Sequence, residues 1–492
     1  MADYILAIDQ GTTGSTALLV GGDLAVHGKE TVDFPQHYPR PGWVEHDPEE
    51  IWHSVRRAVR QLLAATAVDP TQIAAIGITN QRETTLLWER SDGRPVANAV
   101  VWQCRRSADI CTDLKAAGLE EAIRAKTGLV LDPYFSATKL TWLLREQPAL
   151  QNRAAAGKLA FGTVDTFLAW HLTGGKAHVT DVSNASRTLL MDLRTLGWDA
   201  DLLQTFAIPA ALLPEIVPSA AVYGSTCGLD FLPDGIPVAG MAGDQQAALF
   251  GQACFRAGES KCTYGTGAFL LENTGSTPVA SRTGLLTTVA WQVAGETTYA
   301  LEGSSFIAGA AVQWLRDGLG LVHTAAEIET LARQVPDSGG VVFVPALTGL
   351  GAPHWNSGAR GLISGITRGT SAAHLARATL EGIALQIVDL CRAMATDKGT
   401  PLTLLKADGG AAHNDLLMQL QADLLDKPVS RPQTVETTAL GAAMLAGLAV
   451  GFWRDQAEVA ASWQEERRFV PQAESAWRED LLDRWNRAVQ RA

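Results

Sequence analysis

The stretch Asp9-Gln10-Gly11-Thr12-Thr13-Gly14 lies between an apolar run that ends beside Asp9 and a second apolar run, Ala17 to Val20. This pattern predicts a β-hairpin whose tip consists of small polar groups. Glycine lets the backbone adopt positive φ and come close to a bulky anion. Exposed amides and threonine hydroxyls can then bind phosphate oxygens, and a neighbouring carboxylate can hold Mg²⁺ through water. An ordinary hairpin turn also explains these residues, so the rest of the chain has to distinguish the two interpretations.

Two further glycine-rich turns occur in the second half of the sequence. One lies in Thr263–Leu271, where Gly-Thr again precedes an apolar strand, and the other follows a short apolar run at Asp408–Asn414. Two strand–turn–strand units, one early and one in the middle of the chain, predict two related domains that face each other. We place the boundary near residue 250, which gives residues 1–250 and 251–492. A length of 492 residues is also more than one hydrophobic core usually organises.

Strand-like and helix-like segments alternate near the N-terminus. Tyr4–Asp9 and Ile73–Thr79 have the pattern of buried strands. Between them, Asp47 is a candidate N-cap, Pro48 suits the first helical position, and Glu50 is placed to complete a capping box. This alternation predicts an α/β fold.

Charge and cysteine usage limit the classes of function. The net charge of −12 argues against general binding to nucleic acid or to acidic membranes. No basic region followed by an apolar segment and a cleavage site is seen, so no export signal is predicted. The longest apolar stretch, Ala439–Trp453, suits a buried helix better than a membrane span. The six cysteines show no zinc spacing, and we expect reduced, mostly buried thiols in a cytoplasmic protein.

Several well-known nucleotide and catalytic motifs are absent from the sequence. Gly265–Leu270 begins like a dinucleotide fingerprint but ends in leucine and precedes a strand, so it does not fit a Rossmann fold. No P-loop sequence and no Gly-x-Ser-x-Gly elbow occur. The ten histidines have no His-Glu-x-x-His or similar spacing, which argues against a catalytic zinc.

Two polar segments are candidates for substrate binding and catalysis. Thr79–Thr85 follows a predicted strand and offers only polar side chains, which suits a small molecule rich in hydroxyl groups. A surface loop with an Arg–Glu pair is the alternative. Asp244 lies between a glycine turn and an apolar helix, where a carboxylate could cap that helix. It could instead act as a general base that takes a proton from an alcohol.

Three aromatic residues have polar neighbours, although aromatic side chains usually belong to the core. They are Trp102, Tyr134 and Phe269. Aromatic faces can cover the C–H side of a polyol while polar groups bind its hydroxyls, so these residues are candidates for a substrate site.

Together these residues resemble the FGGY carbohydrate kinase family and, within it, the kinases that act on glycerol. The similarity extends over nearly the whole chain. The two family signatures run from Tyr134 to Glu146 and from Gly361 to Glu381. The segments typical of the glycerol branch are Pro41–Pro48, Thr79–Thr85, Trp102–Arg106 and Gly243–Gln246.

The resemblance implies an α/β fold of two ribonuclease-H-like domains, of the actin and hexokinase type, with ATP in the cleft between them. It implies phosphorylation of glycerol by ATP and Mg²⁺, with Asp244 as the general base and Asp9 orienting the metal ion. The implied glycerol contacts are Arg82, Glu83, Trp102, Tyr134, Asp244, Gln245 and Phe269. The implied nucleotide contacts are Thr12, Thr13, Gly14, Thr266, Gly309, Gln313, Gly410 and Asn414.

Two places depart from the family pattern. Thr16 stands where family members usually have arginine, so one cationic phosphate contact is missing and nucleotide binding is expected to depend more on Mg²⁺ and on Lys or Arg elsewhere. The stretch Cys227–Gly235 lacks the Gly-Gly-Thr-Arg run that binds fructose 1,6-bisphosphate in some members, and it contains two aspartates. We therefore expect no inhibition by that ligand. The histidine that other members phosphorylate is also missing from this stretch.

Two other functions stay open at this point. One is a kinase of another small polyol or ketose, and the other is a non-catalytic, actin-like ATP-binding module or sensor. Arg82-Glu83 with Trp102 and Phe269 favours a three-carbon polyol, and the presence of Asp9 and Asp244 argues against the module. The expected partners are glycerol and ATP, without nucleic acid or membrane insertion. Relatives are often dimers or tetramers, so a homo-oligomer is expected.

Overall fold

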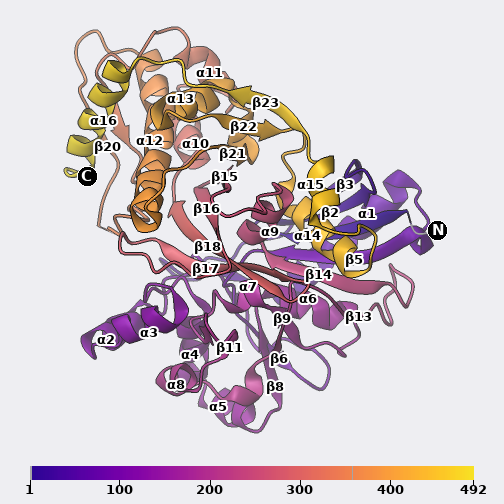
Figure 1. Cartoon of the computed structure of the whole chain (residues 1–492). Coiled ribbons are helices and arrows are strands. Elements are labelled where there is room, and N and C mark those ends of the chain that lie inside the picture. Colours follow the sequence, from indigo (N-terminus) through magenta and orange to yellow (C-terminus); the bar gives the residue numbers. More distant parts are fainter. Residues whose placement is uncertain (1–2, 357) are drawn as a thin grey trace.

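The computed structural model describes residues 3–356 and 358–492 and contains two mixed β-sheets with helices on their faces (Figure 1). The first sheet has six strands, in the spatial order β13 (Ala220–Ser225), β14 (Pro237–Gly243), β5 (Ile73–Asn80), β1 (Tyr4–Gln10), β2 (Gly14–Gly21) and β3 (Val26–Asp33). The second has seven, in the order β17 (Leu286–Val293), β18 (Glu296–Ser305), β16 (Ala268–Gly275), β15 (Ser260–Tyr264), β21 (Leu405–Asp408), β22 (Val429–Pro432) and β23 (Glu465–Phe469).

The two sheets share one topology. In each, three strands that pair antiparallel are followed by two parallel strands, which gives β3-β2-β1-β5-β14 in the first sheet and β18-β16-β15-β21-β22 in the second. This is the ribonuclease-H-like arrangement that the family resemblance implied, and both sheets confirm it. Because the topology is repeated, the first turn of each sheet occupies an equivalent place in the fold.

Short sheets and helices complete the architecture. The two-stranded sheets are β4 (Glu45–His46) with β7 (Ala99–Val100), β6 (Leu86–Glu89) with β8 (Leu159–Gly162), β9 (Val179–Asp181) with β12 (Glu215–Val217), β10 (Met191–Asp192) with β11 (Gly197–Trp198), and β19 (Val342–Val344) with β20 (Leu362–Ser364). The helices of the first half are α1 (Pro48–Thr66), α2 (Ala108–Ala116), α3 (Glu120–Thr127), α4 (Ser136–Glu146), α5 (Pro148–Ala155), α6 (Val164–Leu172), α7 (Val182–Ala185), α8 (Ala200–Thr205) and α9 (Asp244–Gly251). Those of the second half are α10 (Gly309–Asp317), α11 (Glu327–Ala332), α12 (Ala372–Lys398), α13 (Asp415–Leu425), α14 (Thr437–Ala449), α15 (Gln456–Ser462) and α16 (Ser475–Val489). Short 3₁₀ turns span Pro70–Gln72, Ala210–Leu212 and Gly410–His413.

Helix α1 begins where the sequence predicted, but its cap differs from the prediction. The Asp47 side chain accepts a hydrogen bond from the Glu49 amide at 2.9 Å. Glu50 does not complete a capping box, because its carboxylate interacts with Nε2 of His37 at 3.0 Å. The prediction of a capping box was therefore wrong, because Glu50 interacts with His37 and not with the backbone amide of Asp47.

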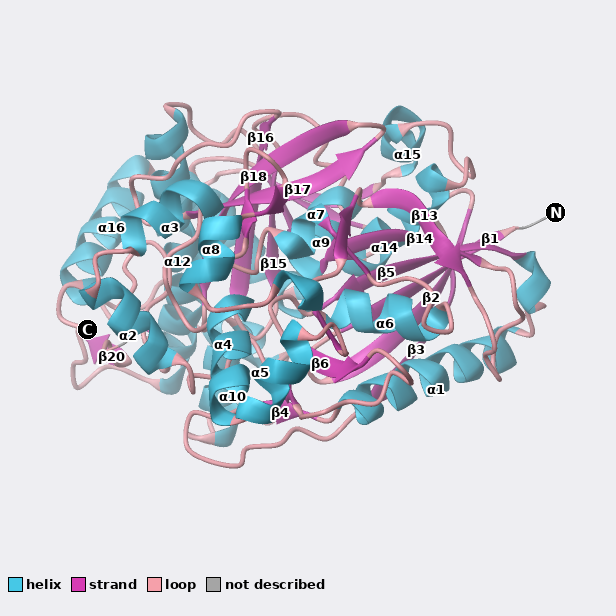
Figure 2. Ribbon diagram, turned by 90° about the horizontal axis from the view of Figure 1, so that it is seen from below, coloured by secondary structure: helices cyan, strands magenta, loops and turns pink. Residues whose placement is uncertain are grey.

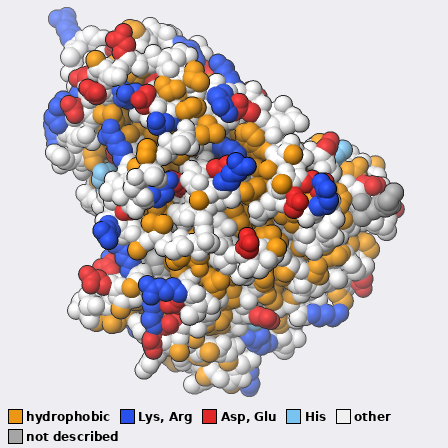
Figure 3. Space-filling model, in the orientation of Figure 1, with side chains coloured by type: hydrophobic (Ala, Val, Ile, Leu, Met, Phe, Trp, Pro, Cys, Tyr) orange, Lys and Arg blue, Asp and Glu red, His pale blue; other side chains and the backbone are white. Residues whose placement is uncertain are grey.

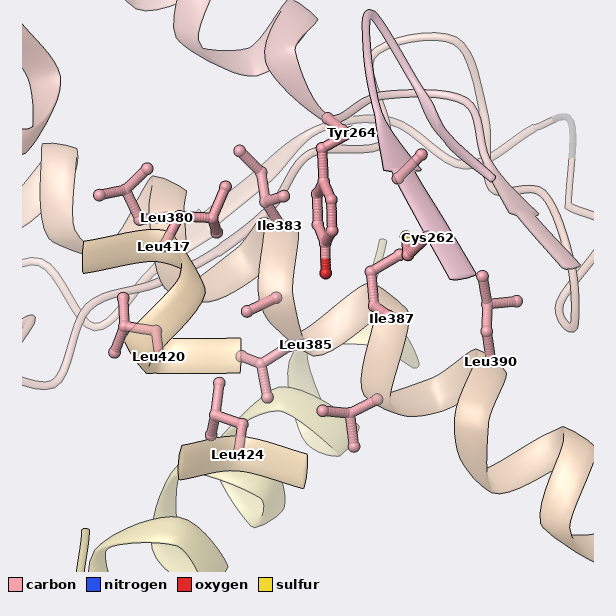
Figure 4. Packing of buried hydrophobic residues seen from close by; sticks show 14 of the residues in the cluster. Cys262, Tyr264, Leu380, Ile383, Leu385, Ile387, Leu390, Leu417, Leu420 and Leu424 are labelled. Atoms are coloured by element: carbon pink, nitrogen blue, oxygen red, sulfur yellow. The ribbon is translucent and has the colours of Figure 1, made fainter. Parts of the chain in front are cut away.

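The core of the second half lies between β15 and the helices α12 and α13 (Figure 4). Cys262 and Tyr264 project from β15 toward Ile383 and Ile387 of α12. The buried Tyr264 hydroxyl donates a hydrogen bond to Oε1 of Gln421 on α13 at 2.7 Å. This packing fixes the end of β15, and the second glycine turn starts at the next residue.

Helix α14 belongs to the second half of the sequence, yet it packs on the first sheet and on α9 (Figures 1 and 2). The approach is so close that small residues are required. A Cβ atom added to Gly441 of α14 would lie 1.8 Å from the carbonyl oxygen of Ala247 in α9. A Cβ atom on Gly77 of β5 would lie 2.2 Å from the carbonyl oxygen of Ala442. The apolar stretch around Ala439 is thus a buried helix, as predicted.

Replacing Gly441 with alanine is expected to lower the free energy of unfolding by about 1–3 kcal/mol, because the backbones of α9 and α14 have to separate. The measurement is thermal or denaturant-induced unfolding. Gly369→Ala is the matched control, because a Cβ atom there meets only the Thr367 hydroxyl, at 3.9 Å, and its φ is not positive. Equal stability of both variants and the unaltered chain would contradict the close packing.

The surface shown in Figure 3 carries charges of both signs, and the thiols are mostly buried, as the sequence predicted. On the face drawn in Figure 3, basic and acidic side chains are interspersed. All six cysteines are free thiols, and all but Cys227 are buried. Within residues 3–356 and 358–492, none of the helices has the length and apolar character needed to cross a membrane.

Candidate active site

The first glycine turn closes the β1–β2 hairpin. The Gly11 amide donates to the Gly14 carbonyl at 2.9 Å, and Nε2 of Gln81 donates to the Gly11 carbonyl at 3.2 Å. Thr13 is exposed at the tip, whereas Thr12 is half-buried and its Oγ1 accepts a hydrogen bond from Nε1 of Trp102 at 2.9 Å. This last bond matters because it joins a residue predicted to contact phosphate to one predicted to contact glycerol.

The second glycine turn is tied to the start of α10. The Thr266 carbonyl accepts from the Ala308 and Ala310 amides at 2.8 and 3.1 Å. Gly309 is the first residue of α10, and a Cβ atom on it would lie 2.7 Å from the Gly265 carbonyl oxygen. Gln313 is exposed one turn further along the helix. The amides of Ala308, Gly309 and Ala310 are thus bonded to the second turn, and they hold the exposed Thr266 at the N-terminus of α10.

The third glycine turn follows β21, which runs parallel to β15 and pairs Asp408 with Thr263. Gly409 has a φ of +85° and lies against the Tyr264 backbone. Gly410 is exposed, and a Cβ atom on it would meet no atom within 4 Å. Asn414 caps α13 by accepting from the Leu417 amide at 2.9 Å. The second and third turns thus meet at one edge of the second sheet and leave open space there, which fits a nucleotide.

Asp244 is the first residue of α9, and Gly243 rather than Asp244 occupies the N-cap position. The pairing of Gly243 with Asn80 brings the start of α9 next to the end of β5. Oδ1 of Asp244 accepts from the Gln245 amide at 2.7 Å and lies 3.1 Å from Nε of Arg82. Oδ2 takes part in neither contact, and the side chain is 32 % exposed. One carboxylate oxygen is therefore held while the other can receive a proton.

A buried network of four charged side chains lies beside Asp244. Both terminal nitrogens of Arg82 donate to the carboxylate of Glu302, at 2.5 and 2.9 Å. Nη2 of Arg187 donates to the same carboxylate at 3.0 Å, and its Nε donates to Oε1 of Glu83 at 2.7 Å. All four side chains are almost fully buried, so removal of any one of them would leave an oppositely charged partner buried and unpaired.

The charges of this network are reflected in the pKa values of its acids. Burial alone would raise the pKa of Glu302, but Arg187 and Arg82 outweigh it and lower that pKa to about 2. Burial raises the pKa of Glu83 in spite of both arginines. Enclosure likewise raises the pKa of Asp244, an effect that Arg82 and Lys261 oppose. A carboxylate with a raised pKa is a better proton acceptor, which suits the role expected of Asp244.

Aromatic side chains border the same place. The rings of Trp102 and Tyr134 meet edge to face with centroids 5.7 Å apart, and Nη2 of Arg82 lies 3.5 Å from the Tyr134 hydroxyl. Phe269 on β16 pairs with Ser304 on β18, two residues from Glu302, so it lies on the sheet face that carries Glu302. The aromatic residues expected at a glycerol site thus lie beside the charged network.

Comparison with known proteins places this arrangement in a family. Models of the FGGY family of carbohydrate kinases match residues 4–251 with the N-terminal domain and residues 260–450 with the C-terminal domain. The chain belongs to this family of kinases. This FGGY kinase is 58 % identical to a glycerol kinase of Myxococcus xanthus, over 100 % of this chain and 99 % of the relative. It is 56 % identical to a glycerol kinase of Carboxydothermus hydrogenoformans, with coverage of 99 % and 98 %.

Solved structures agree with this assignment. The crystal structure of Plasmodium falciparum glycerol kinase with ADP has a TM-score of 0.92 and 37 % identity to this FGGY kinase, and covers 99 % of this chain and 98 % of that one. Gluconate kinase from Lactobacillus acidophilus has a TM-score of 0.88 at 24 % identity, over 98 % of this chain and 97 % of that one. The second similarity concerns the fold alone.

Sequence reasoning missed three charged residues of this FGGY kinase. Glu302 and Lys261 lie in the strands β18 and β15, and a buried charge inside an apolar strand is a usable signal. Lys261 is fully buried and donates from Nζ to Oε1 of Gln245 at 2.5 Å. Arg187 lies in a stretch of mixed composition that gave no signal.

Asp9 lies at the end of β1, in the part of the kinase where the first turn and Asp244 come together. Burial raises its pKa to about 7, and the charges of Asp244 and Glu436 add to the effect, whereas Lys29 opposes it. A carboxylate that is unfavourably charged beside other acids is a fitting neighbour for a divalent cation, which would offset the repulsion. Mg²⁺ at Asp9 stays a prediction, because residues 3–356 and 358–492 contain no cluster of three or more His, Cys, Asp or Glu side chains that could hold a metal ion.

Proposed function

We propose that this FGGY kinase transfers the γ-phosphoryl group of ATP to glycerol, with glycerol 3-phosphate and ADP as products. The observation that carries the proposal is the contact of Asp244 with Arg82, beside Tyr134 and Trp102, whose indole nitrogen is bonded to Thr12 of the first glycine turn. Glycerol kinases 54–58 % identical to the whole chain support the choice of glycerol. The Plasmodium falciparum glycerol kinase was crystallised with ADP, which supports an adenine nucleotide.

In the proposed reaction the chain positions its substrates and neutralises charge, as in phosphoryl transfer generally. Oδ2 of Asp244 accepts the proton of a terminal glycerol hydroxyl, whose oxygen attacks the γ-phosphorus in line. Asp9 would hold Mg²⁺, which would supply positive charge to the triphosphate. The amides and hydroxyls of the turns then bind the phosphate and adenosine parts, through Thr12, Thr13, Gly14, Thr266, Gly309, Gln313, Gly410 and Asn414.

Glycerol itself is held by polar groups at one side and by rings at the other. Arg82 and Glu83 offer a donor and an acceptor fixed by Glu302 and Arg187. Gln245 adds an amide that is oriented by Lys261. Trp102, Tyr134 and Phe269 cover the carbon atoms, which selects a short polyol over a larger sugar.

The test is the release of ADP by the purified kinase, measured with and without glycerol. We expect ADP release that depends on glycerol and a kcat/KM for glycerol at least tenfold above those for erythritol, xylulose and gluconate, about the discrimination that one unpaired hydroxyl gives. A ketose or another polyol as the best substrate would replace glycerol in the proposal. ATP binding without transfer to any of them would favour the non-catalytic module.

Fructose 1,6-bisphosphate is expected not to inhibit the reaction. In the stretch Cys227–Gly235, Asp230 is 2.5 Å from Nη2 of Arg56 and 2.7 Å from Nη2 of Arg60. Arg56 and Arg60 of α1 are thus already paired with Asp230 of this loop. Their positive charge is therefore less available to attract a bisphosphate. The measurement is the initial rate across a range of inhibitor concentrations, with the product ADP as positive control. A saturable inhibition curve would contradict the prediction.

The proposal also covers the domain boundary, the location in the cell and the oligomeric state. We place the division between an N-terminal and a C-terminal kinase domain near residue 250, which is supported by the separate sheets of β1–β14 and β15–β23. We further propose that the protein works in the cytoplasm as a dimer or tetramer. Light scattering after gel filtration tests the oligomeric state.

A further inference from the structure

Lys29 lies on β3, which pairs with the second strand of the first glycine hairpin, but it belongs to neither predicted group of contacts. On β3 it pairs with Leu18 of β2, which in turn pairs with Ala7 of β1. Residues that pair across a sheet share one face, and Ala7 and Asp9 are two residues apart on β1. Lys29 and Asp9 therefore lie on the same face of the first sheet.

The Nζ atom of Lys29 forms an ion pair with Oε1 of Glu436, a residue 407 positions later in the chain. Glu436 immediately precedes α14, whose first residue, Thr437, donates from Oγ1 to Oδ2 of Asp408 at 2.8 Å. Asp408 in turn leads into the third glycine turn. The ion pair thus lies where the edge of the first sheet, α14 and the phosphate-binding turns meet.

The balance of charge at this place is unfavourable for a nucleotide. Three acids gather here: Asp9 pairs with Thr79, whose neighbour Asn80 pairs with Gly243 just before Asp244, and Glu436 is held at Lys29. Thr16, which pairs with Asp9 across the hairpin, is uncharged. Lys29 is a cation on the sheet face that carries Asp9, and its ammonium is paired with Glu436. A triphosphate that binds beside Asp9 would therefore lie on the sheet face from which the positively charged Lys29 projects.

The ion pair can open without disturbing the fold. The side chains of Lys29 and Glu436 are 42 % and 34 % exposed, and such solvent-screened pairs are weak. Lysine carries its charge on a flexible four-carbon stem, so the ammonium can move while the strand stays in place. Phosphate oxygens with more than one negative charge are stronger partners for it than one half-exposed carboxylate.

We propose that Lys29 is a nucleotide-binding residue of this kinase, and that Glu436 holds its ammonium group until the phosphates of ATP or ADP take that group over. Glu436 then acts as a competitor that weakens nucleotide binding, and the position of Thr16 needs no cation because Lys29 supplies one from the next strand. The inference rests on the proposed nucleotide site and identifies the residue that determines its affinity.

Two substitutions are expected to act in opposite directions. Lys29→Met should weaken ADP binding about tenfold, which corresponds to the loss of one charge-assisted hydrogen bond. Glu436→Gln should tighten ADP binding by about two- to fivefold, because it removes the competing exposed ion pair. ADP with Mg²⁺ is titrated by calorimetry, which measures binding without any glycerol turnover. Failure of the glycerol reaction is therefore distinguishable from failure of this inference.

The controls separate a binding role from a structural one. Lys115→Met breaks an ion pair of similar exposure, with Glu120, remote in the fold, and should leave ADP affinity unchanged. Lys29→Arg should retain most of the affinity, and Glu436→Gln should lose its effect in the Lys29→Met background. Added salt should weaken ADP binding less in Lys29→Met than in the unaltered kinase. Unchanged ADP affinity in Lys29→Met, or lowered thermal stability as its only effect, would overturn the inference.

Discussion

The variant Asp244→Asn is expected to lose about 10²–10⁴-fold in kcat, the usual contribution of a general base, while it still binds glycerol. Asparagine has the same shape, and its amide oxygen can keep the contacts with the Gln245 amide and Nε of Arg82. It cannot accept the proton of the attacking hydroxyl. The measurements are kcat for ADP release and the dissociation constant for glycerol by calorimetry.

A matched control tests the simpler explanation that Asp244 only stabilises the start of a helix. Asp455 caps α15 by accepting from the Glu458 amide at 2.9 Å, and asparagine is an equally good cap. Asp455→Asn should therefore retain full activity. Substantial turnover in Asp244→Asn would remove Asp244 from the reaction and leave it the structural role alone.

The variant Glu302→Gln is expected to destabilise the protein by about 3–5 kcal/mol, because it leaves the buried Arg82 and Arg187 without their shared carboxylate. It should also raise the KM for glycerol, since Arg82 loses the bidentate contact that orients it. Denaturant-induced unfolding and steady-state kinetics measure the two effects. The low pKa of Glu302, about 2, means that its charge is present throughout the ordinary pH range.

The strand of Glu302 provides a control for the removal of one negative charge. Glu296 lies on the same strand, β18, but is exposed, so Glu296→Gln should change stability by less than about 0.5 kcal/mol. Adding Arg187→Met to Glu302→Gln should recover part of the lost stability, because it removes one of the unpaired cations. Equal stability of Glu302→Gln and the unaltered chain would show that the network does not depend on this carboxylate.

Much of the fold could be predicted because its signals are local. The strands at Tyr4 and Ile73, the hairpin turn at Gly11 and the helix after Asp47 all follow from neighbouring residues, and each lies within a residue or two of its prediction. The predicted capping box does not form, because the Glu50 carboxylate interacts with His37, which lies outside the helix. The sequence around a helix start shows which side chains within one turn could form a cap. It does not show which other residues, such as His37, will bind those side chains in the folded protein.

Some residues of the candidate site could likewise be predicted from the sequence, and others could not. Asp244, Arg82 and the aromatic residues could be named because they occur in recognisable segments, and the fold brings them together. Glu302 and Arg187 could not be connected with Arg82 from the sequence, since they come from distant segments that meet only when the chain folds.

The sequence by itself determined the glycine turns, the strands around them and the type of chemistry that an acid beside such turns can perform. These properties depend on backbone freedom and on the order of neighbouring side chains. The tertiary structure alone decided which charges neutralise one another: Glu302 with two arginines, and Lys29 with Glu436 across 407 residues. Electrostatic energy depends on distance in space, and distance along the chain carries no information about it.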